Sequence, residues 1–272
     1  MTDWAERAEQ FLSLHSGERL LLLPNPWDLG SAKLFESMGF DALATTSAGF
    51  AMTAGRLDGS VSRDEAIAHA ASIAEATDLP VSADLENCFA DDPAGVAETL
   101  RLAAGAGLAG ASIEDYTRNE DDPIYEVGLA TERVAAAAEA AHAGEAHLVL
   151  TARAENHLYE AADLADTIAR LQAYQEAGAD VLYAPGLHRL DDILQLVSSV
   201  DLPVNVLAWP GGPSVSELAS VGVRRVSVGS AFAYAALGAA AEAARELIDE
   251  GTYEFWTQGS VGAKAARSAF AA

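Results

Sequence analysis

The sequence is poor in cysteine and in basic residues. Its single cysteine, Cys88, excludes an internal disulfide and is typical of a protein from a reducing compartment. Only 16 lysines and arginines stand against 41 acidic residues, which gives a formal net charge of -25. Because such a chain repels nucleic acid and anionic membrane surfaces, we expect neither as a partner.

Long apolar runs and several familiar motifs are also missing. No uninterrupted apolar stretch reaches the roughly 18 residues of a membrane span, and Met1–Glu6 does not start a signal peptide. The sequence contains no Gly-x-x-x-x-Gly-Lys, Cys-x-x-Cys or His-Glu-x-x-His, so motifs give no support to nucleotide hydrolysis or zinc catalysis. We therefore expect a cytoplasmic protein.

Apolar residues are abundant, at 50% of the 272 residues, and their pattern alternates between strand and helix periods. This length and composition predict a single domain. The predicted strands are Arg19–Asn25, Ala42–Ser47, Pro80–Glu86, Gly110–Tyr116, Leu148–Glu155, Val181–Gly186, Pro203–Ala208 and Arg224–Ser230. Eight strands that alternate with helices predict a (β/α)8 TIM-type barrel, with a doubly wound open sheet as the alternative.

Helix ends are marked by polar residues and glycines. Ser62–Glu65 reads as a capping box, and a helix is expected from Asp163 to Ala177. Gly39, Gly178 and Gly222 each stand where a helix turns into the next strand, so we expect left-handed backbone there.

Two predicted connections are longer than a barrel needs. Residues Ala48–Val61 follow the second strand, and Thr117–Ala130 follow the fourth. Long loops at the carboxyl ends of barrel strands often act as lids, although a solvated acidic loop explains the second segment equally well.

Carboxylates end two neighbouring predicted strands. Asp84 and Glu86 alternate along one strand, which predicts that both face the barrel mouth, and Glu114 ends the next strand. Oxygen ligands of this kind suit Mg²⁺. The alternative is that these acids cap neighbouring helices. Asp115 is expected to point toward the helical layer.

Arg153 ends the fifth predicted strand among apolar residues. Its guanidinium is suited to binding a carboxylate or stabilising an enolate oxygen, and an ion pair with Glu114 or Glu155 is a compatible alternative. His157 follows and is a candidate general acid or base, although a lone loop histidine is more often incidental.

Several other segments reach the same predicted mouth. Asn25–Asp28 ends the first strand and Thr45–Gly49 the second, where exposed backbone N–H groups suit an anionic oxygen. Asn205 lies on the seventh strand, and Trp209–Pro213 follows it, either as a rim of the pocket or as a tight turn only.

These segments together resemble the isocitrate lyase and phosphoenolpyruvate mutase superfamily, and the resemblance runs across nearly the whole barrel. The matching segments are Asn25–Asp28 with Ser31–Lys33, Gly39–Leu43, Pro80–Asn87, Gly110–Asp115 and Thr151–Arg153. The resemblance implies a barrel whose last helix is exchanged with a neighbouring subunit, in a dimer or a dimer of dimers. It also implies Mg²⁺ or Mn²⁺ held around Asp84, with Glu86 and Glu114 acting largely through water.

The resemblance further implies that Thr46, Ser47 and Ala48 hold the substrate carboxylate and that Arg153 contacts the substrate, and position at the predicted mouth adds further residues. Those expected to bind the substrate are Trp27, Asp28, Thr46, Ser47, Ala48, Arg153 and Asn205. Arg153, Glu114 and His157 are the expected catalytic residues.

Two departures from the superfamily pattern narrow the expected chemistry. Isocitrate and methylisocitrate lyases carry a catalytic cysteine in the loop after the fourth strand, whereas Thr117–Asp122 contains neither cysteine nor histidine. The motif Asp-x-Asp-Thr-Gly-Tyr/Phe-Gly is changed to Asp84–Ala90, which has lost both glycines. Cys88 lies within it and is expected to be a small packed thiol.

We therefore predict a divalent-metal-dependent lyase that decarboxylates or retro-aldol cleaves a small 2-oxo or 2-hydroxy acid through an enolate. The alternatives are phosphonopyruvate hydrolysis or phosphoenolpyruvate mutase-like P–C chemistry and, in another class, a barrel that binds a metabolite without turnover. Residues 1–250 are expected to form the catalytic barrel. The aromatic segment 251–272 is expected to pack on a neighbouring subunit of a homo-oligomer, a dimer or tetramer.

Overall fold

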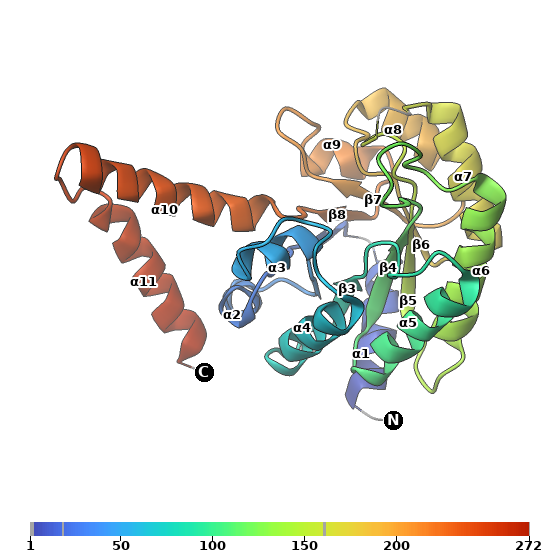
Figure 1. Ribbon diagram of the computed structural model, residues 1–272, viewed down its shortest axis with the longest axis horizontal. Coiled ribbons are helices and arrows are strands. Elements are labelled where there is room, and N and C mark those ends of the chain that lie inside the picture. The colour runs from blue at the N-terminus through green and yellow to red at the C-terminus, as the bar shows by residue number, and fades with distance from the viewer. Residues whose placement is uncertain (1–2, 18, 160–161, 272) are drawn as a thin grey trace.

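Eight parallel strands form a nearly closed (β/α)8 TIM-type barrel in a computed structural model of the protein, which describes residues 3–17, 19–159 and 162–271 (Figure 1). The strands are β1 (Leu21–Leu23), β2 (Leu43–Ala44), β3 (Val81–Asp84), β4 (Gly110–Glu114), β5 (Val149–Arg153), β6 (Val181–Tyr183), β7 (Val204–Leu207) and β8 (Arg225–Ser227). The hydrogen-bonded order is β1-β8-β7-β6-β5-β4-β3-β2. All eight predicted strands are confirmed, and each regular core is shorter than the predicted segment.

The backbone N–H of Ala44 donates to the carbonyl of Pro24 at 3.1 Å, which links the two ends of this sheet. The barrel is thereby brought close to closure. Within the predicted segments 1–250 and 251–272, residues 1–2, 18, 160–161 and 272 lie outside the described residues.

Helices surround the barrel and also close its amino-terminal end. They are α1 (Asp3–Leu14), α2 (Leu29–Ser37), α3 (Ser47–Thr53), α4 (Arg63–Glu75), α5 (Pro93–Gly105), α6 (Val127–His142), α7 (Leu164–Glu176), α8 (Leu190–Val197), α9 (Val215–Ser220), α10 (Ala231–Asp249) and α11 (Trp256–Phe270). In α1, Ala5, Ala8 and Phe11 are buried against strand residues such as Val149 and Val181. This helix therefore seals the end of the barrel opposite the carboxyl ends of the strands.

The predicted helix ends are present. The hydroxyl of Ser62 accepts the backbone N–H of Glu65, whose carboxylate accepts the N–H of Ser62, as a capping box requires. Gly39, Gly178 and Gly222 have φ values of 86°, 102° and 90°, in the left-handed region that favours glycine.

The two long connections differ from the expectation in part. The first part of the segment 48–61 is helical, because the short helix α3 runs to Thr53. The side chain of Thr46 caps this helix. The second connection ends at Glu126, where α6 begins, and Tyr116 pairs with Ile124 in an isolated antiparallel bridge. Both connections lie at the carboxyl ends of the strands.

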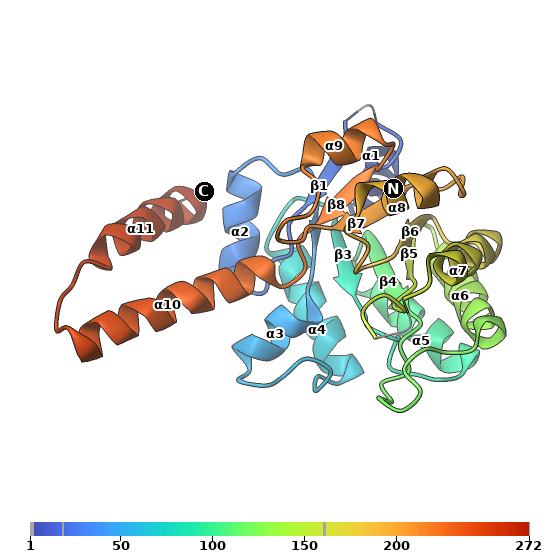
Figure 2. The same cartoon turned by 90° about the horizontal axis from the view of Figure 1, so that it is seen from above.

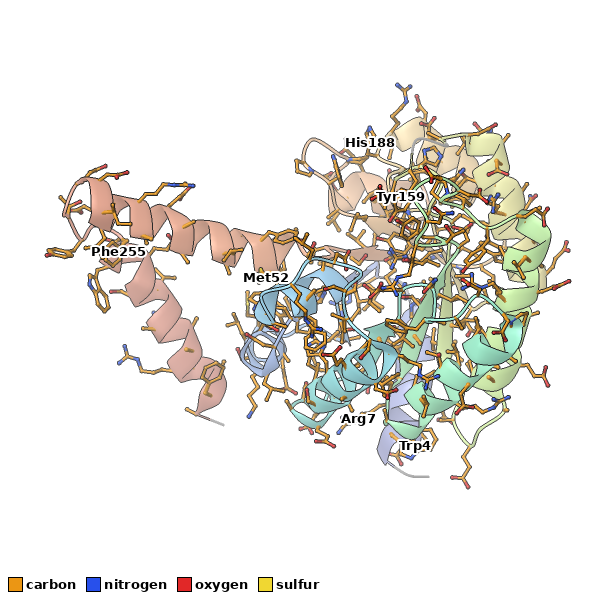
Figure 3. The ribbon with its side chains drawn as sticks, viewed as in Figure 1. Trp4, Arg7, Met52, Tyr159, His188 and Phe255 are labelled. Atoms are coloured by element: carbon orange, nitrogen blue, oxygen red, sulfur yellow. The ribbon has the colours of Figure 1, made fainter. Side chains whose placement is uncertain are left out.

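The last two helices form an arm that leaves the barrel (Figure 2). Figure 3 places Phe255, at the turn between α10 and α11, far from Tyr159 on the barrel. The arm starts at Ala231, and its far end returns so that Phe270 lies near Gly30 of α2. None of the described helices is both long and apolar enough to cross a membrane.

Candidate active site

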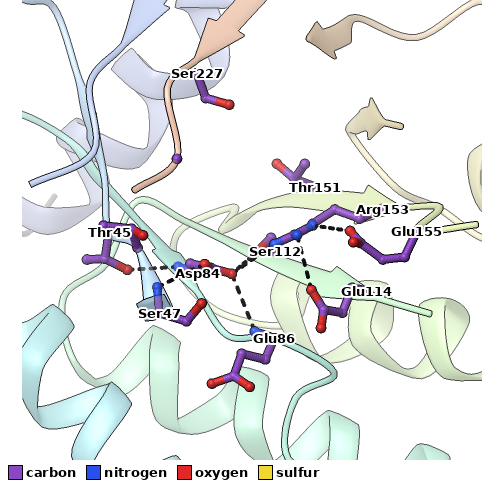
Figure 4. Close-up of polar contacts among 12 residues, drawn as sticks. Thr45, Ser47, Asp84, Glu86, Ser112, Glu114, Thr151, Arg153, Glu155 and Ser227 are labelled. Atoms are coloured by element: carbon purple, nitrogen blue, oxygen red, sulfur yellow. Dashed lines mark hydrogen bonds and ion pairs between the residues drawn. The ribbon is translucent and has the colours of Figure 1, made fainter. Parts of the chain in front are cut away.

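Arg153 is the centre of an ion-pair cluster at the carboxyl ends of three adjacent strands (Figure 4). Its Nη1 lies 3.0 Å from Oδ1 of Asp84, its Nη2 lies 3.2 Å from Oε2 of Glu114, and its Nε lies 2.7 Å from Oε1 of Glu155. Register explains the convergence, because Glu114 of β4 pairs with Arg153 of β5. The expected ion pairs with Glu114 and Glu155 are therefore both present.

Asp84 is held in place from a second side by the segment after β2. The backbone N–H of Ser47 donates to Oδ2 of Asp84 at 3.0 Å, and the N–H of Asp84 donates to Oγ1 of Thr45 at 2.9 Å. Because Thr46 caps α3, the residues Thr46, Ser47 and Ala48 are fixed along the wall of the mouth. The first turn of this helix and the Asp84 carboxylate thus form one rigid unit.

Glu86 does not lie on β3, contrary to the alternation expected from the sequence. The strand ends at Asp84, and Glu86 adopts a φ of 49°, followed by Cys88 at 59° and Phe89 at 56°. Three residues other than glycine thus occupy left-handed backbone, a strained arrangement that often accompanies functional sites. Glu86 is turned toward the loop after β4, where its Oε2 pairs with Arg118.

Arg118 is a site residue that sequence reasoning missed. Its Nη2 also donates to the carbonyl of Gly59 at 2.9 Å, so it joins the connection after β4 to the connection after β2. It lines the outer part of the site together with Glu86, Tyr116 and Tyr159. No local sequence signal marks this arginine, since its partners are remote in sequence.

The acids at the mouth outnumber the bases and are poorly solvated. Burial raises the pKa of Glu86 to about 7 despite Arg118, and burial likewise raises the pKa of Glu155 to about 7 despite Arg153. The pKa of Glu114 is also raised, chiefly by burial. When all are ionised, these three glutamates and Asp84 carry more charge than the guanidinium groups of Arg118 and Arg153. A divalent cation would offset this excess of negative charge.

The donor set fits a hard divalent ion. Asp84, Glu86 and Glu114 supply oxygen ligands, but within the described part of the chain they do not form a triad with ligand atoms all within 4.8 Å. Magnesium usually keeps several waters and takes one or two direct carboxylates. The arrangement therefore suits an ion bound directly by some of these groups and through water by the others.

Two adjoining cavities open beside the cluster. The inner one has a volume of about 410 Å³ and the outer one about 370 Å³, and both are lined by Ser47, Asp58, Arg153 and Leu158. Volumes of this size are typical of small-molecule sites. Tyr234, in the first turn of α10, forms part of the inner wall.

The inner cavity reaches a buried cation that the sequence analysis did not select. Arg225 donates through Nε to Oδ1 of Asn205 at 2.9 Å and through Nη2 to Oγ1 of Thr151 at 3.0 Å. Its Nη1 lies 3.1 Å from Nε2 of His15, whose Nδ1 lies 2.8 Å from the carbonyl of Phe11. These partners are neutral, and burial lowers the pKa of Arg225 to about 10.

Asn205 lines the inner cavity as expected, but three other predicted site residues do not line either cavity. Asp28 is exposed and caps α2, accepting the N–H of Ser31 at 2.7 Å. The carbonyl of Trp27 contacts Nε2 of His69 at 3.0 Å, and its ring packs on Phe35. From the first strand, Asn25 lines the cavity instead.

His157 is the third predicted site residue that lines neither cavity. It lies in the turn after β5 with its Cβ against Gly186, and its buried Nε2 has no hydrogen-bond partner among the described residues. Burial lowers the pKa of His157. His157 lines neither cavity, so the structure gives its proposed role as a general acid or base no geometric support.

Two other residues behave as packed groups. Cys88 is fully buried, and burial raises the pKa of its thiol to about 12, so it is an unreactive packing residue. Asp115 faces the helical layer as expected, where it accepts hydrogen bonds from Tyr174 at 2.6 Å and Arg170 at 3.3 Å.

Residues 11–248 match the family model described as phosphoenolpyruvate phosphomutase. A crystal structure of a putative lyase/mutase from Burkholderia cenocepacia J2315 is 50% identical, with a TM-score of 0.96 over 100% of this chain and 98% of that one. An uncharacterized protein from Mycobacterium tuberculosis is 34% identical over 88% of this chain and 89% of its own length.

Two relatives with assigned activities are more distant. A probable 2-methylisocitrate lyase from Corynebacterium glutamicum is 26% identical over 93% of this chain and 86% of its own length. An oxaloacetate decarboxylase from Chromohalobacter salexigens is 27% identical over 88% of this chain and 84% of its own length.

Proposed function

Because the chain belongs to the phosphoenolpyruvate phosphomutase family, we propose that it is a divalent-metal-dependent lyase that cleaves a C–C bond of a small 2-oxo or 2-hydroxy acid. The observation that carries this proposal is the cluster of Asp84, Glu114 and Glu155 around Arg153, beside a cavity of about 410 Å³. Decarboxylation of an oxaloacetate-like acid is the favoured reaction, in line with the oxaloacetate decarboxylase relative.

The substrate carboxylate is proposed to bind between Arg153 and the backbone of Thr46–Ala48. A guanidinium offers two parallel N–H donors to a carboxylate, and both groups line the inner cavity. Arg225 adds positive charge deeper in the same cavity, which favours a dianionic substrate. Together with a bound divalent ion, these guanidinium groups would offset the repulsion that the acidic chain exerts on an anion.

Asp84, Glu86 and Glu114 are proposed to hold Mg²⁺ or Mn²⁺, directly or through water. Such an ion supplies Lewis-acid stabilisation to the oxygen on which enolate charge develops. In the favoured reaction, the electrons of the broken C–C bond move into the enolate as CO₂ leaves, and a proton then returns to the carbon. Glu114 lines the outer cavity and has a raised pKa, so it is the favoured candidate for carrying that proton.

P–C bond chemistry is the second candidate function. It gains support from Arg118, because the outer cavity then contains two guanidinium groups, Arg118 and Arg153, that suit a phosphonate. The site would then act as a phosphonopyruvate hydrolase or a mutase.

The test is a turnover screen of the purified, chelator-treated protein with oxaloacetate, substituted malates and phosphonopyruvate, with and without Mg²⁺ or Mn²⁺, followed by NMR. We expect turnover with a 2-oxo or 2-hydroxy acid that requires the metal and is lost in Asp84→Asn. Asp41→Asn, a surface carboxylate paired with Arg19, is the matched control and should retain full activity.

Phosphate or phosphoenolpyruvate formed from phosphonopyruvate would favour the second candidate. Ligand binding without turnover of any substrate, in metal-loaded protein, would instead indicate a metabolite-binding barrel. Equal turnover with and without metal would contradict both metal-dependent proposals.

A further inference from the structure

We propose that His142, His147 and Asp180 form a second metal site, for a first-row transition ion such as Zn²⁺, at the amino-terminal end of the barrel. His142 is the last residue of α6, His147 precedes β5 by two residues, and Asp180 directly precedes β6. One ligand atom from each residue lies within 4.8 Å of the other two. This site is independent of the proposed reaction, because the mouth lies at the opposite ends of the same strands.

The two imidazole rings present the same nitrogen to the same carboxylate. Nε2 of His142 lies 3.0 Å from Oδ2 of Asp180, and Nε2 of His147 lies 2.7 Å from Oδ1. The rings stack with centroids 3.9 Å apart and an interplanar angle of 17°. Stacking thus places the two Nε2 atoms on one side, where a shared ligand can meet both.

The carboxylate is oriented from behind by the backbone. Oδ2 of Asp180 also accepts the N–H of Leu150 at 2.8 Å, and the N–H of Asp180 donates to the carbonyl of Leu150 at 2.9 Å. Groups that orient a ligand in this way raise metal affinity. Asp180 is therefore held in position before any ion binds.

The spacing requires a small adjustment to accept an ion. With metal–ligand bonds of about 2.0–2.2 Å and tetrahedral angles, neighbouring ligand atoms stand roughly 3.3 Å apart. The two observed N···O distances, 3.0 and 2.7 Å, must open by a few tenths of an ångström. The side chains that must move retain exposed fractions of 28% and 37%, so they have room, and water can complete the coordination.

The ligand types select the ion. Two imidazole nitrogens with one carboxylate oxygen suit Zn²⁺, Co²⁺ or Ni²⁺, whereas Mg²⁺ prefers oxygen ligands alone. Binding needs an Nε2 that carries no proton, so a neutral ring that donates to Asp180 shifts that proton to Nδ1, and an imidazolium ring releases one proton to solvent. The bound ion would tie the end of α6 and the start of β5 to β6, so its expected effect is on stability and not on turnover.

The test measures Zn²⁺ binding to the full-length, chelator-treated protein by titration calorimetry in excess Mg²⁺, with thermal unfolding as a second readout. The variants are His147→Gln and Asp180→Asn. His188→Gln is the matched control, because this exposed histidine lies in the loop after β6, outside the cluster. Asp84→Asn removes a proposed ligand at the mouth, so a loss of Zn²⁺ binding in this variant would place the ion there.

We expect one Zn²⁺ per chain in the wild type, His188→Gln and Asp84→Asn, with a raised Tm. Affinity should fall at least tenfold in His147→Gln and in Asp180→Asn, and both should lose the rise in Tm. Co²⁺ bound to the wild type should give visible absorption bands that His147→Gln lacks. Zn²⁺ binding that is unchanged in both cluster variants, or lost only in Asp84→Asn, would overturn the proposal.

Discussion

Arg153 and Asp84 form an ion pair of 3.0 Å that joins β5 to β3 across the end of β4. The same guanidinium also contacts Glu114 and Glu155, so a single side chain organises the acids of the mouth. Its geometry, more than its charge, is what the cluster requires, since Nη1, Nη2 and Nε each have a different carboxylate partner.

Arg153→Lys should therefore impair the site while keeping the charge. A lysine cannot reproduce the planar set of donors, so we expect turnover of the substrate found in the screen to fall by roughly 100-fold or more. The measurement is kcat and KM of this variant, compared with those of Arg63→Lys as the control. Arg63 lies at the surface and pairs with Asp64. Unchanged kinetics in the Arg153 variant would remove it from the proposed binding role.

His15 should make the protein less stable in mild acid. Burial is the main cause that lowers its pKa from 6.5 to about 3, so the unfolded chain binds a proton that the folded chain resists. The resulting stability is complete above pH 6.5 and is lost as the pH falls toward 3. Between pH 7 and pH 5 the titration of His15 should lower the free energy of unfolding by about 2 kcal/mol.

Denaturant unfolding at the two pH values, with His15→Gln for comparison, checks this expectation. The substitution removes the titrating group, so the variant should lose less stability than the wild type over the same interval. His188→Gln should behave as the wild type. Equal pH dependence in wild type and His15→Gln would mean that other groups, among them the mouth acids, account for the whole effect.

The loop after β4 should exclude isocitrate lyase chemistry. Its backbone is closed on itself, since Oγ1 of Thr117 donates to the carbonyl of Asp122 at 2.5 Å, and residues 117–122 include no cysteine or histidine. We expect no glyoxylate from isocitrate and no pyruvate from methylisocitrate with Mg²⁺ present. A coupled assay that detects either product above the level of Asp84→Asn would refute this, and the methylisocitrate lyase relative makes the assay worthwhile.

The arm of α10 and α11 should associate with another copy of the chain. Large apolar side chains remain exposed along it, among them Leu237 at 52%, Ile248 at 80% and Trp256 at 63%. Apolar surface of this kind marks association sites. We expect light scattering at micromolar concentration to give a dimer or tetramer.

Ile248→Glu should shift that mass toward the monomer, because it places a charge on the exposed face of α10. Leu57→Glu is the matched control, since Leu57 is 85% exposed in a barrel loop. A monomeric wild type would show that the arm does not mediate self-association.

Strand ends were the most predictable part of the site. In a parallel barrel the carboxyl ends share one rim, so Asp84, Glu114 and Arg153 could be brought together from strand order alone. Glu86 was wrongly assigned to the strand. Its backbone is left-handed, and no glycine at or beside this position marks that conformation in the sequence. Arg118 pairs with a residue 32 positions away, and the partners of Arg225 lie 20, 74 and 210 positions away, which no local pattern reveals.

Asp28 illustrates a different limit. Its spacing to Ser31 fits a capping box as well as a binding segment, and the helix end is what the fold realises. At the end of the first strand, Asn25 lines the cavity and Asp28 faces solvent, a difference that the spacing of the two residues does not reveal.

Tyr234 is both a wall of the inner cavity and a residue of the first turn of α10. The helix that supplies this wall is the one that carries the exposed arm, and a helix of 19 residues extends for roughly 28 Å as one stiff rod. Whatever fixes the far end of the rod therefore also acts on the helix that carries this wall residue. If the arm associates with another copy of the chain, as expected above, turnover per chain should depend on protein concentration.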